Sequence, residues 1–207
     1  MRIVYDITQT AEMGLAGWPG LPVLMEENNE LFPEETALWQ GLAPREKHKP
    51  KKISGLEEKS GFWDLLCLVG ESHESQYDVL RTNLTNSNSR MACLALSGQG
   101  FHGQRQRPWR ALAGNLHLSI SVPLEMESGP GALGWTMLPA VAMMRVLKEF
   151  GIEDPYGIKW VNDIFCGNKK MGGVISALSV SEGQIRRGFL GLGLNVAVSP
   201  QIDSETC

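Results

Sequence analysis

The sequence has no long hydrophobic run and no excess of positive charge. No apolar stretch approaches the roughly 20 residues that a membrane-spanning helix needs, so we expect no membrane partner. The opening residues, MRIVYDITQTAEMG, lack the basic segment and apolar core of a signal peptide. The formal net charge of -4 argues against a broad attraction to nucleic acid. We therefore predict a soluble, cytoplasmic protein with no nucleic-acid partner, in which any anionic ligand meets a local basic cluster.

Cysteine is scarce as well. Cys67, Cys93, Cys166 and Cys207 include no close pair of the kind that zinc sites use. This spacing predicts reduced thiols, three in apolar surroundings and one at a terminus, and no metal site built from protein side chains.

Hydrophobic and charged contents are those of an ordinary globular protein, at 43% and 20% of 207 residues. That length suits one sizeable domain, or one domain with an extension. Residues 1–60 are rich in charge, proline and glycine, and we interpret them as an N-terminal extension of unclear fold. A basic run inside it is either a solvated loop or a docking surface for an acidic partner. From residue 61 apolar runs replace this charge-rich composition, and we place a second unit at 61–207.

Four segments after residue 61 can be assigned from their patterns. Residues 62–70 form a compact apolar run typical of a buried strand, and residues 75–86 have the apolar spacing of a short helix. Residues 91–97 show almost no polar alternation, which suits a central strand. Residues 98–115 form a basic loop by their glycine and glutamine content.

Residues 115–123 alternate strictly between apolar and polar side chains. This period of two predicts a strand with one buried face. The face expected in the core carries Leu116, Leu118, Ile120 and Val122. The opposite face carries His117, Ser119 and Ser121.

Residues 134–151 repeat apolar side chains at helical spacing. We predict a helix that ends at Gly151 and holds Pro139 in its first turn. The side chains expected to face the core are Leu138, Val141, Ala142, Met144, Val146, Leu147 and Phe150.

The remaining segments predict strands. Strands over 158–165 and 169–180 are joined by a hairpin signal at residues 167–169, and a further strand covers 186–200. The order of strands, a helix and then antiparallel strands predicts an α+β fold. We expect a mixed, largely antiparallel sheet with helices on one face.

Cations stand out at two places. Arg105 and Arg107 lie in the basic loop, where guanidinium groups suit a phosphate or carboxylate covered during reaction; an ordinary solvated loop is the alternative. Lys159 lies among apolar residues, where a cation is costly unless an anion meets it or its head reaches water from an edge. Strand alternation puts Lys159 and Asn162 on opposite faces, unless a turn intervenes at Asn162-Asp163.

Gly191 and Gly193 lie inside a strand pattern, GLGLNV. Glycine weakens a strand and usually permits the close approach of a ligand or of another backbone. No helix follows the segment, so it is not a dinucleotide-binding fingerprint.

Taken in order, AGNLHLSISVP, KWVND, KKMGGVIS and GLGLNV resemble the catalytic domain of biotin protein ligases, whose segments read GxNLYxS, KWPND, KxGGIL and GIGINV. The resemblance runs from about residue 91 to 199. It implies a class II synthetase-like ligase domain that uses ATP, with Mg2+, to convert biotin into biotinyl-5'-adenylate. A lysine in the biotin-acceptor domain of a carboxylase then attacks this mixed anhydride. Members of this family often form homodimers through sheet edges.

The resemblance assigns roles to individual residues. Lys159 matches the family's active-site lysine, which contacts the biotin carboxylate and the phosphate, so it is expected to be catalytic. The residues expected to bind biotin or its adenylate are Ser75, Gln99, His102, Gly103, Gln104, Arg105, Arg107, Trp109, Gly114, Asn115, Lys159, Gly172 and Gly173. The residues expected at the nucleotide are Trp160, Asn162, Asp163 and Asn195.

The basic loop departs from the family pattern GRGRxGRxW. Phe101 and Gln106 replace glycines, and His102 and Gln104 replace arginines. Two expected cations are therefore lost, although a protonated His102 restores one. We expect weaker retention of the adenylate, a different acid substrate, or lost activity.

Two alternatives stay open beside a biotin protein ligase. One is a lipoate or octanoate ligase-like transferase, although lipoate ligases favour an RRxSGGG-type loop that this sequence lacks. The other is a non-catalytic biotin-binding relative, which the altered loop favours. Because the chain ends soon after GLGLNVAVSP, we expect either a fragment or a reduced version of the domain.

Overall fold

The computed structural model describes residues 2–5, 33–42, 51–53, 62–152 and 155–201. In chain order its strands and helices are β1 (Arg2–Tyr5), α2 (Pro33–Leu42), β2 (Lys51–Ile53), β3 (Leu65–Ser72), α3 (Gln76–Asn83), β4 (Met91–Gly98), the 3-10 helix η2 (Gln104–Gln106), β5 (Leu116–Glu127), the 3-10 helix η3 (Pro130–Leu133), α4 (Gly134–Glu149), β6 (Tyr156–Lys159), β7 (Asp163–Cys166), β8 (Lys169–Ser181) and β9 (Gln184–Leu194).

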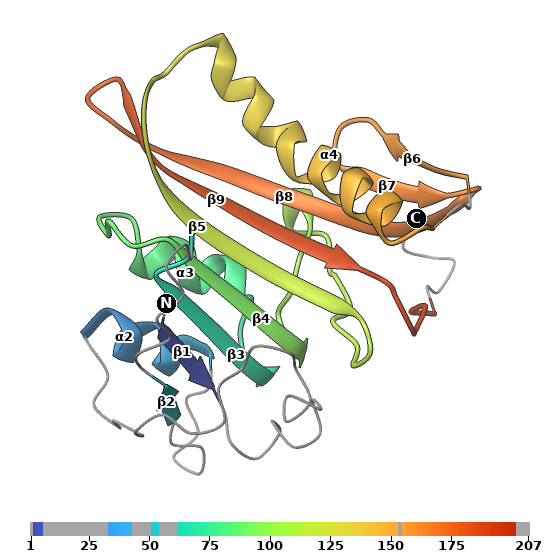
Figure 1. Cartoon of the computed structure of the whole chain (residues 1–207), viewed down its shortest axis with the longest axis horizontal. Helices are drawn as coiled ribbons and strands as arrows, with labels where there is room; N and C mark the ends of the chain where they lie inside the picture. The colour runs from blue at the N-terminus through green and yellow to red at the C-terminus, as the bar shows by residue number, and fades with distance from the viewer. Residues whose placement is uncertain (1, 6–32, 43–50, 54–61, 153–154, 202–207) are drawn as a thin grey trace.

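The strands form a nine-stranded sheet in the order β2-β1-β3-β4-β5-β9-β8-β7-β6. Strand β3 runs parallel to both of its neighbours, β1 and β4, and every other neighbouring pair is antiparallel. In Figure 1 the sheet runs from β1 and β2 near the N-terminus to β6 and β7 at the far side, with α4 lying across β8. The predicted α+β class with a mixed, largely antiparallel sheet is confirmed.

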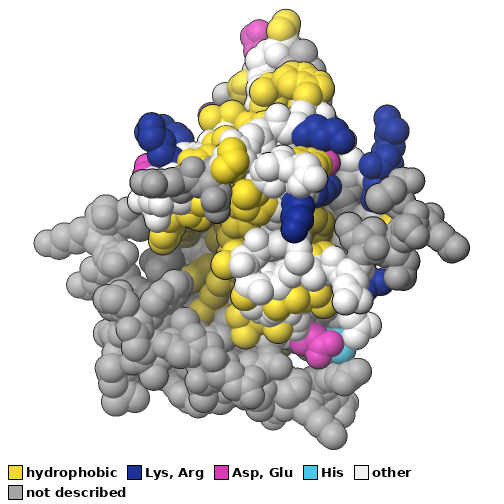
Figure 2. Space-filling model, turned by 90° about the vertical axis from the view of Figure 1, so that its right-hand side faces the viewer, with side chains coloured by type: hydrophobic (Ala, Val, Ile, Leu, Met, Phe, Trp, Pro, Cys, Tyr) yellow, Lys and Arg dark blue, Asp and Glu magenta, His cyan; other side chains and the backbone are white. Residues whose placement is uncertain are grey.

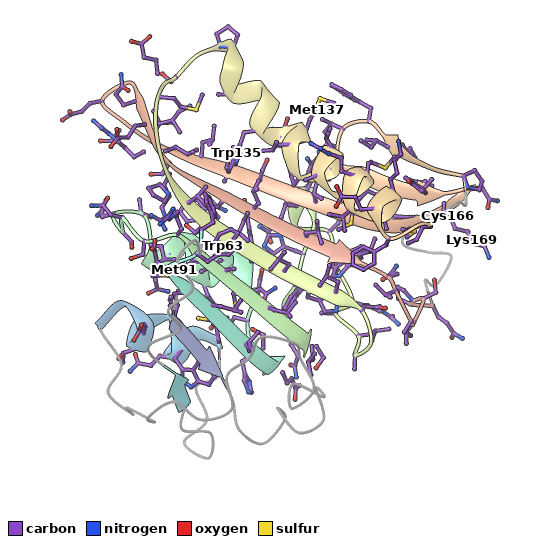
Figure 3. All side chains as sticks on the ribbon, viewed as in Figure 1. Trp63, Met91, Trp135, Met137, Cys166 and Lys169 are labelled. Carbon is purple, nitrogen blue, oxygen red and sulfur yellow. The ribbon has the colours of Figure 1, made fainter. Side chains whose placement is uncertain are left out.

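Most elements predicted after residue 61 are present. The apolar runs at 62–70 and 91–97 correspond to β3 and β4, and the short helix corresponds to α3. The predicted hairpin at residues 167–169 joins β7 to β8, because Gly167 adopts a positive φ of 59° that glycine tolerates without a steric cost. Figure 3 shows Cys166 and Lys169 at this hairpin.

Helices cover both faces of the sheet, which corrects the prediction that they lie on one. Gly188 and Gly191 are three positions apart on β9, so they point to opposite faces. A Cβ atom on Gly188 would collide with Trp135 of α4, whereas a Cβ atom on Gly191 would lie 3.1 Å from Tyr77 of α3. Figure 3 shows Trp135 between α4 and the sheet.

Strand β5 buries the face that its sequence predicted to be exposed. His117, Ser119 and Ser121 are 1%, 2% and 0% exposed, whereas the leucine and isoleucine side chains opposite them are only half-buried. Ser121 accepts a hydrogen bond of 2.5 Å from Nε of the fully buried Arg187, and the other two residues line a cleft. Polar side chains are buried here because each meets a polar partner or a cleft.

The core face predicted for α4 is wrong for most of its members. The buried side chains of α4 are Pro139, Ala140, Met143 and Leu147. The predicted core residues Leu138, Val141, Val146 and Phe150 are instead 49%, 45%, 42% and 81% exposed. The helix begins at Gly134, which puts Pro139 in its second turn rather than its first. Helix α4 therefore contacts the sheet along a narrow stripe, which periodicity alone does not locate.

The strand predicted over residues 158–165 is two strands. Strand β6 ends at Lys159, a three-residue turn follows, and β7 begins at Asp163, with Lys159 and Asp163 paired across the hairpin. Strand β9 ends at Leu194, so the predicted continuation to residue 200 is not a strand.

The cysteines agree in part with the prediction. Cys67, Cys93 and Cys166 are free thiols, and the first two are buried. Burial, with a smaller contribution from Glu35, raises the pKa of Cys67 to about 12. Cys166 is only half-buried, which corrects its predicted apolar surroundings, because its hairpin lies at the end of the sheet. Cys207 lies outside the described residues.

The described parts of residues 1–60 join the rest of the fold. They add β1 and β2 to the sheet, and Leu38, Trp39 and Leu42 of α2 to the main apolar core. The division at residue 60 stays a prediction, and most of the basic run lies outside the described residues. In the part of the chain that the structure describes, none of the helices combines the length and the apolar character needed to cross a membrane.

Candidate functional site

A cleft of about 320 Å³ collects most of the predicted site residues. It opens between α3, the basic loop and strands β5 to β9. The predicted residues that line it are Ser75, His102, Gly103, Gln104, Arg105, Arg107, Trp109, Lys159, Trp160, Asn162, Asp163 and Gly173. Figure 2 faces the end of the molecule that carries β6 and β7, and shows Lys and Arg side chains over its upper half beside a strip of hydrophobic side chains.

A row of paired residues crosses five neighbouring strands along this cleft. Lys159 pairs with Asp163, Asp163 with Gly173, Gly173 with Gly193, and Gly193 with His117. Directly paired residues point to the same face of a sheet. Neighbouring strands lie roughly 4.8 Å apart, so the row spans about 19 Å across the sheet between the backbones of its two end residues. The cleft therefore has an exposed lysine at one end and a buried imidazole at the other.

The ammonium of Lys159 has no carboxylate partner among the described residues. Its Nζ lies 5.3 Å from the ring centre of Phe165. Asp163, which lies opposite it, forms an ion pair of 2.8 Å with Nζ of Lys170 instead. The side chain of Lys159 is exposed at the cleft, so its charge is available to an anionic ligand.

Asn162 fixes the turn that carries Lys159. Its Nδ2 donates a hydrogen bond of 2.8 Å to the carbonyl of Val174, and the backbone N–H of Val174 donates one of 2.9 Å to the carbonyl of Asn162. The turn between β6 and β7 was the exception that the sequence left open, and it brings Lys159 and Asn162 into the same cleft.

Lys170 is a cleft residue that the sequence analysis did not select. Besides its ion pair with Asp163, its Nζ lies 5.9 Å from the ring centre of Trp109. Its position just before Gly172 and Gly173, in the segment that resembles KxGGIL, was a usable signal. Other lining residues that were missed include Gln76, Tyr77, Phe101, His117 and Ser119.

The basic loop is a tight hairpin with exposed arginines. The N–H of Gly103 donates to the carbonyl of Arg107 at 2.8 Å, and the N–H of Trp109 donates to the carbonyl of Phe101 at 2.8 Å. Arg105 has a positive φ of 58°, which is uncommon for a residue other than glycine. Both predicted arginines line the cleft with their side chains exposed.

His102 ties the loop to α3. Its Nε2 lies 2.6 Å from Oδ2 of Asp78 and its Nδ1 lies 3.0 Å from the carbonyl of Gly103. Burial lowers the pKa of His102, but these two hydrogen bonds and the charge of Asp78 outweigh it, so the pKa lies above its ordinary value. The charge that His102 restores is thus compensated by Asp78 and does little for an anion in the cleft.

Glycine at position 193 lets an aromatic side chain lie against β9. A Cβ atom there would sit 2.5 Å from the ring of Trp109. A close approach does occur at this strand glycine, but the approaching group is the tryptophan side chain of the basic loop rather than the expected ligand or backbone. At Gly172 a Cβ atom would lie 2.8 Å from the carbonyl of Gly193, so this glycine serves close strand packing.

Five predicted binding residues do not line the cleft: Gln99, Gly114, Asn115, Gly172 and Asn195. Oδ1 of Asn115 accepts hydrogen bonds of 2.9 to 3.2 Å from the backbone N–H groups of residues 196–198, and its Nδ2 donates to Oδ1 of Asn195 at 3.2 Å. Asn115 and Asn195 thus organise the segment after β9. Gln99 donates to the carboxylate of Glu71 at 3.3 Å.

The inner end of the cleft is buried and polar. His117 and Gln76 are each 1% exposed, and Nε2 of Gln76 donates a hydrogen bond of 2.6 Å to the carbonyl of His117. The ring of Phe101 meets that of His117 edge to face, with centres 5.7 Å apart. Burial lowers the pKa of His117 below its ordinary value, more than its bond to Leu112 raises it, which favours the neutral ring.

Two curated relatives match part of the chain. The sequence is 32% identical over 109 residues to the bifunctional ligase/repressor BirA of Escherichia coli (strain K12), covering 52% of this chain and 33% of that protein. It is 29% identical over 164 residues to BirA of Bacillus subtilis (strain 168), covering 73% of this chain and 48% of that protein. The chain thus spans less than half the length of these two relatives.

A solved structure and a family model extend the comparison. The biotin protein ligase from Leishmania major, solved in complex with biotinyl-5-AMP, matches with a TM-score of 0.54 at 22% identity, over 66% of this chain and 59% of that one. This likeness supports the predicted synthetase-like fold. The model of the biotin/lipoate A/B protein ligase family matches residues 69–195, more than half of the chain. On this match, the chain belongs to the biotin/lipoate A/B protein ligase family.

Proposed function

We propose that the protein activates biotin with ATP as biotinyl-5'-adenylate and transfers the biotinyl group to a lysine of an acceptor protein. The observation that carries this proposal is the uncompensated ammonium of Lys159 at the open end of a cleft whose other end is buried and polar. The family membership supports it, and the relatives named ligases point the same way.

The first step needs cations because two anions must meet. A carboxylate oxygen of biotin attacks the α-phosphorus of ATP, a C–O–P linkage forms, and the bond to pyrophosphate breaks. Lys159 offsets the repulsion between carboxylate and phosphate and stabilises the charge that grows at phosphorus. Arg105 and Arg107 extend from the loop beside it and are suited to hold the phosphate of the adenylate.

The nucleotide belongs near the turn between β6 and β7 in this proposal. Trp160, Asn162 and Asp163 line the cleft there. Mg2+ is proposed as the companion of ATP, because hard cations bind phosphate oxygens. For Asn195 we propose no direct contact with the adenine. It accepts a hydrogen bond from Asn115, and we propose that it supports the segment after β9.

The second step needs an acceptor at the open end. The lysine of the acceptor attacks the carbonyl of the mixed anhydride, an amide forms and AMP leaves. Trp160, 77% exposed at the cleft, is suited to contact such a partner. We propose the biotin-acceptor domain of a carboxylase in the cytoplasm as that partner, and a homodimer stays a prediction.

Pyrophosphate exchange tests the proposal directly. Radiolabelled pyrophosphate should enter ATP only when biotin is present, and lipoate or octanoate should not replace it. Exchange with lipoate and not with biotin would contradict the biotin assignment.

A non-catalytic binding protein is the second candidate. Its supporting observation is that the charge of His102 is compensated by Asp78, which leaves Arg105 and Arg107 as the loop cations that line the cleft. Biotin binding in a calorimeter without any exchange would favour this candidate over the ligase.

A further inference from the structure

The imidazole of His102 lies between two hydrogen-bond acceptors. Its Nε2 is 2.6 Å from Oδ2 of Asp78 on α3, and its Nδ1 is 3.0 Å from the carbonyl of Gly103 in the basic loop. A carbonyl and an ionised carboxylate only accept, whereas a neutral imidazole carries one N–H. The protonated ring, with a hydrogen on each nitrogen, is therefore the form that satisfies both contacts at once.

The groups around His102 favour this protonated form. The charged and titratable groups that act on its ring are Asp78, Arg81 and Tyr77, all on α3, and within the described residues the strands add no charged group to them. Burial lowers the pKa of His102, but the bonds to Gly103 and Asp78 and the charge of Asp78 outweigh burial and the repulsion by Arg81. The pKa therefore lies above its ordinary value.

The contact at His102 reaches the loop arginines within a few residues. His102 forms a β-bridge with Pro108, and the N–H of Gly103 donates to the carbonyl of Arg107 at 2.8 Å. Arg105 lies in η2, the turn that these two contacts close. Both arginines line the cleft with exposed side chains. A hold on His102 is thus a hold on the base of the hairpin whose tip carries the cations.

We infer that Asp78 is a positioning residue for the proposed adenylation: through protonated His102 it holds the basic loop at the cleft, and this hold weakens when His102 loses its proton. The inference rests on the proposed function for its effect on the adenylate, whereas the contact itself belongs to the free protein. Asp78 does not line the cleft, so it acts through His102 and not on the ligand.

The direction of the pH dependence follows from the same contacts. Below the folded pKa of His102, the ring donates to both acceptors and carries a charge opposite to that of Asp78. As pH rises through that pKa, the ring keeps a single N–H, which serves either Asp78 or the carbonyl of Gly103 but not both. We expect the loop to be held more weakly, and the adenylate to leave faster, on the alkaline side.

Three variants of the full chain separate this role from a general effect of charge. Asp78→Asn removes the charge of the partner at nearly constant size. His102→Arg supplies a cation that stays protonated at every pH used. Glu74→Gln is the matched control, because Glu74 is an exposed carboxylate on the sequence just before α3 and lies outside the cleft. Melting temperatures are recorded, and if Asp78→Asn does not fold, the wild type and His102→Arg decide by the same measurements.

Hydrogen exchange of the ligand-free chain measures how firmly the loop is held. Amide exchange over residues 101–109 is followed at about pH 6 and about pH 8, on either side of the range in which histidine titrates, and is corrected for the intrinsic effect of pH. In the wild type and in Glu74→Gln, protection should be about five-fold higher at the lower pH, as the loss of a charge-assisted hydrogen bond requires. Protection should be low at both pH values in Asp78→Asn and high at both in His102→Arg.

The release of synthetic biotinyl-5'-adenylate is the second measurement. Protein loaded with labelled adenylate is diluted into an excess of unlabelled adenylate at the same two pH values. The wild type and Glu74→Gln should release the label about five-fold faster at the higher pH. Asp78→Asn should release it fast at both pH values, and His102→Arg slowly at both.

Three results overturn the inference. The first is a wild type in which neither loop protection nor release changes with pH. The second is an Asp78→Asn variant that keeps the wild-type dependence on pH. The third is the wild-type dependence in His102→Arg, because a group other than His102 then titrates.

A failure of the proposed function gives a different pattern. If the pH dependence of loop protection disappears in Asp78→Asn but the adenylate does not bind, the ligase assignment is wrong and the positioning of the loop stands. If biotin-dependent pyrophosphate exchange occurs and neither protection nor release responds to Asp78→Asn, the ligase assignment stands and the positioning is wrong.

Discussion

The chemistry of Lys159 follows from what surrounds its ammonium group. A lysine among apolar residues stays charged when water or an anion meets it. The nearby ring of Phe165 supports the cation without neutralising it, and the carboxylate of Asp163 is engaged by Lys170. The cleft thus holds an unneutralised positive charge, which in the proposed reaction would meet the carboxylate and the phosphate.

Replacing Lys159 with alanine should abolish adenylation. We expect Lys159→Ala to slow biotin-dependent pyrophosphate exchange by at least about 100-fold, because one aimed electrostatic group commonly contributes that much to the rate. The melting temperature should be nearly unchanged, since the side chain is exposed. Exchange rate and thermal unfolding are both measured.

Lys169 provides the matched control. It is an exposed lysine at the β7–β8 hairpin (Figure 3). It does not line the cleft. Lys169→Ala should leave the exchange rate within about two-fold, which corresponds to at most ~0.5 kcal/mol in the barrier. A near-normal exchange rate in Lys159→Ala would show that Lys159 is not catalytic.

At the scale of elements, the basic loop is held to the sheet through a glycine. Trp109 follows the loop arginines in sequence and lies against β9 at Gly193. The opposite side of the loop is tied to α3 by the pair of His102 and Asp78. Contacts at both ends of the loop thus determine the positions of Arg105 and Arg107. A substitution in β9 should therefore shift the loop.

Gly193→Ala tests this connection. The added Cβ would lie 2.5 Å from the ring of Trp109, so the ring must move, and we expect a loss of about 1–3 kcal/mol in the free energy of unfolding. The KM for ATP or biotin should rise because the loop shifts with the ring. Urea unfolding and exchange kinetics measure the two effects.

Two further variants show whether the clash is responsible. Gly157→Ala is the control, because a Cβ atom on this strand glycine meets nothing within 4 Å. Adding Trp109→Ala to Gly193→Ala should reduce the cost of the glycine change, since contacting residues couple in double mutants. Independent, additive costs would rule out the proposed contact.

At the scale of the whole molecule, two histidines give stability opposite dependences on pH. The raised pKa of folded His102 means that its contribution is fully present below the ordinary value of 6.5 and is lost as pH rises through the folded pKa. The lowered pKa of folded His117 means that the unfolded chain takes up the proton first as pH falls below 6.5, so stability is lost on that side.

Urea unfolding between about pH 5 and pH 8.5 should resolve the two effects. His117→Gln should flatten the loss of stability below pH 6.5, and His102→Gln should flatten the loss above it. Each variant should leave the loss of stability on the other side of pH 6.5 unchanged. If both variants keep the slopes of the wild type, the two histidines are not the groups responsible.

The sequence by itself determined the elements and the motifs. Apolar runs, strict alternation and turn residues predicted β3, β4, β5, β8 and α3, because these signals act over a few neighbouring residues. The segments around Lys159 and Gly193 indicated the family and located the cleft lysine. The loop substitutions at His102 and Gln104 were also visible in the sequence alone.

The tertiary structure alone decided which faces are buried and which residues meet. Alternation in β5 defines two faces but does not say which one packs inward. The face of His117 is buried because Ser121 bonds to Arg187 and because His117 lines the cleft. In the same way, the turn between β6 and β7 brought Asn162 into the same cleft as Lys159. The carboxylate of Asp78 compensates the charge of His102. A pattern along the chain specifies periodicity, whereas burial and charge compensation depend on segments distant in sequence.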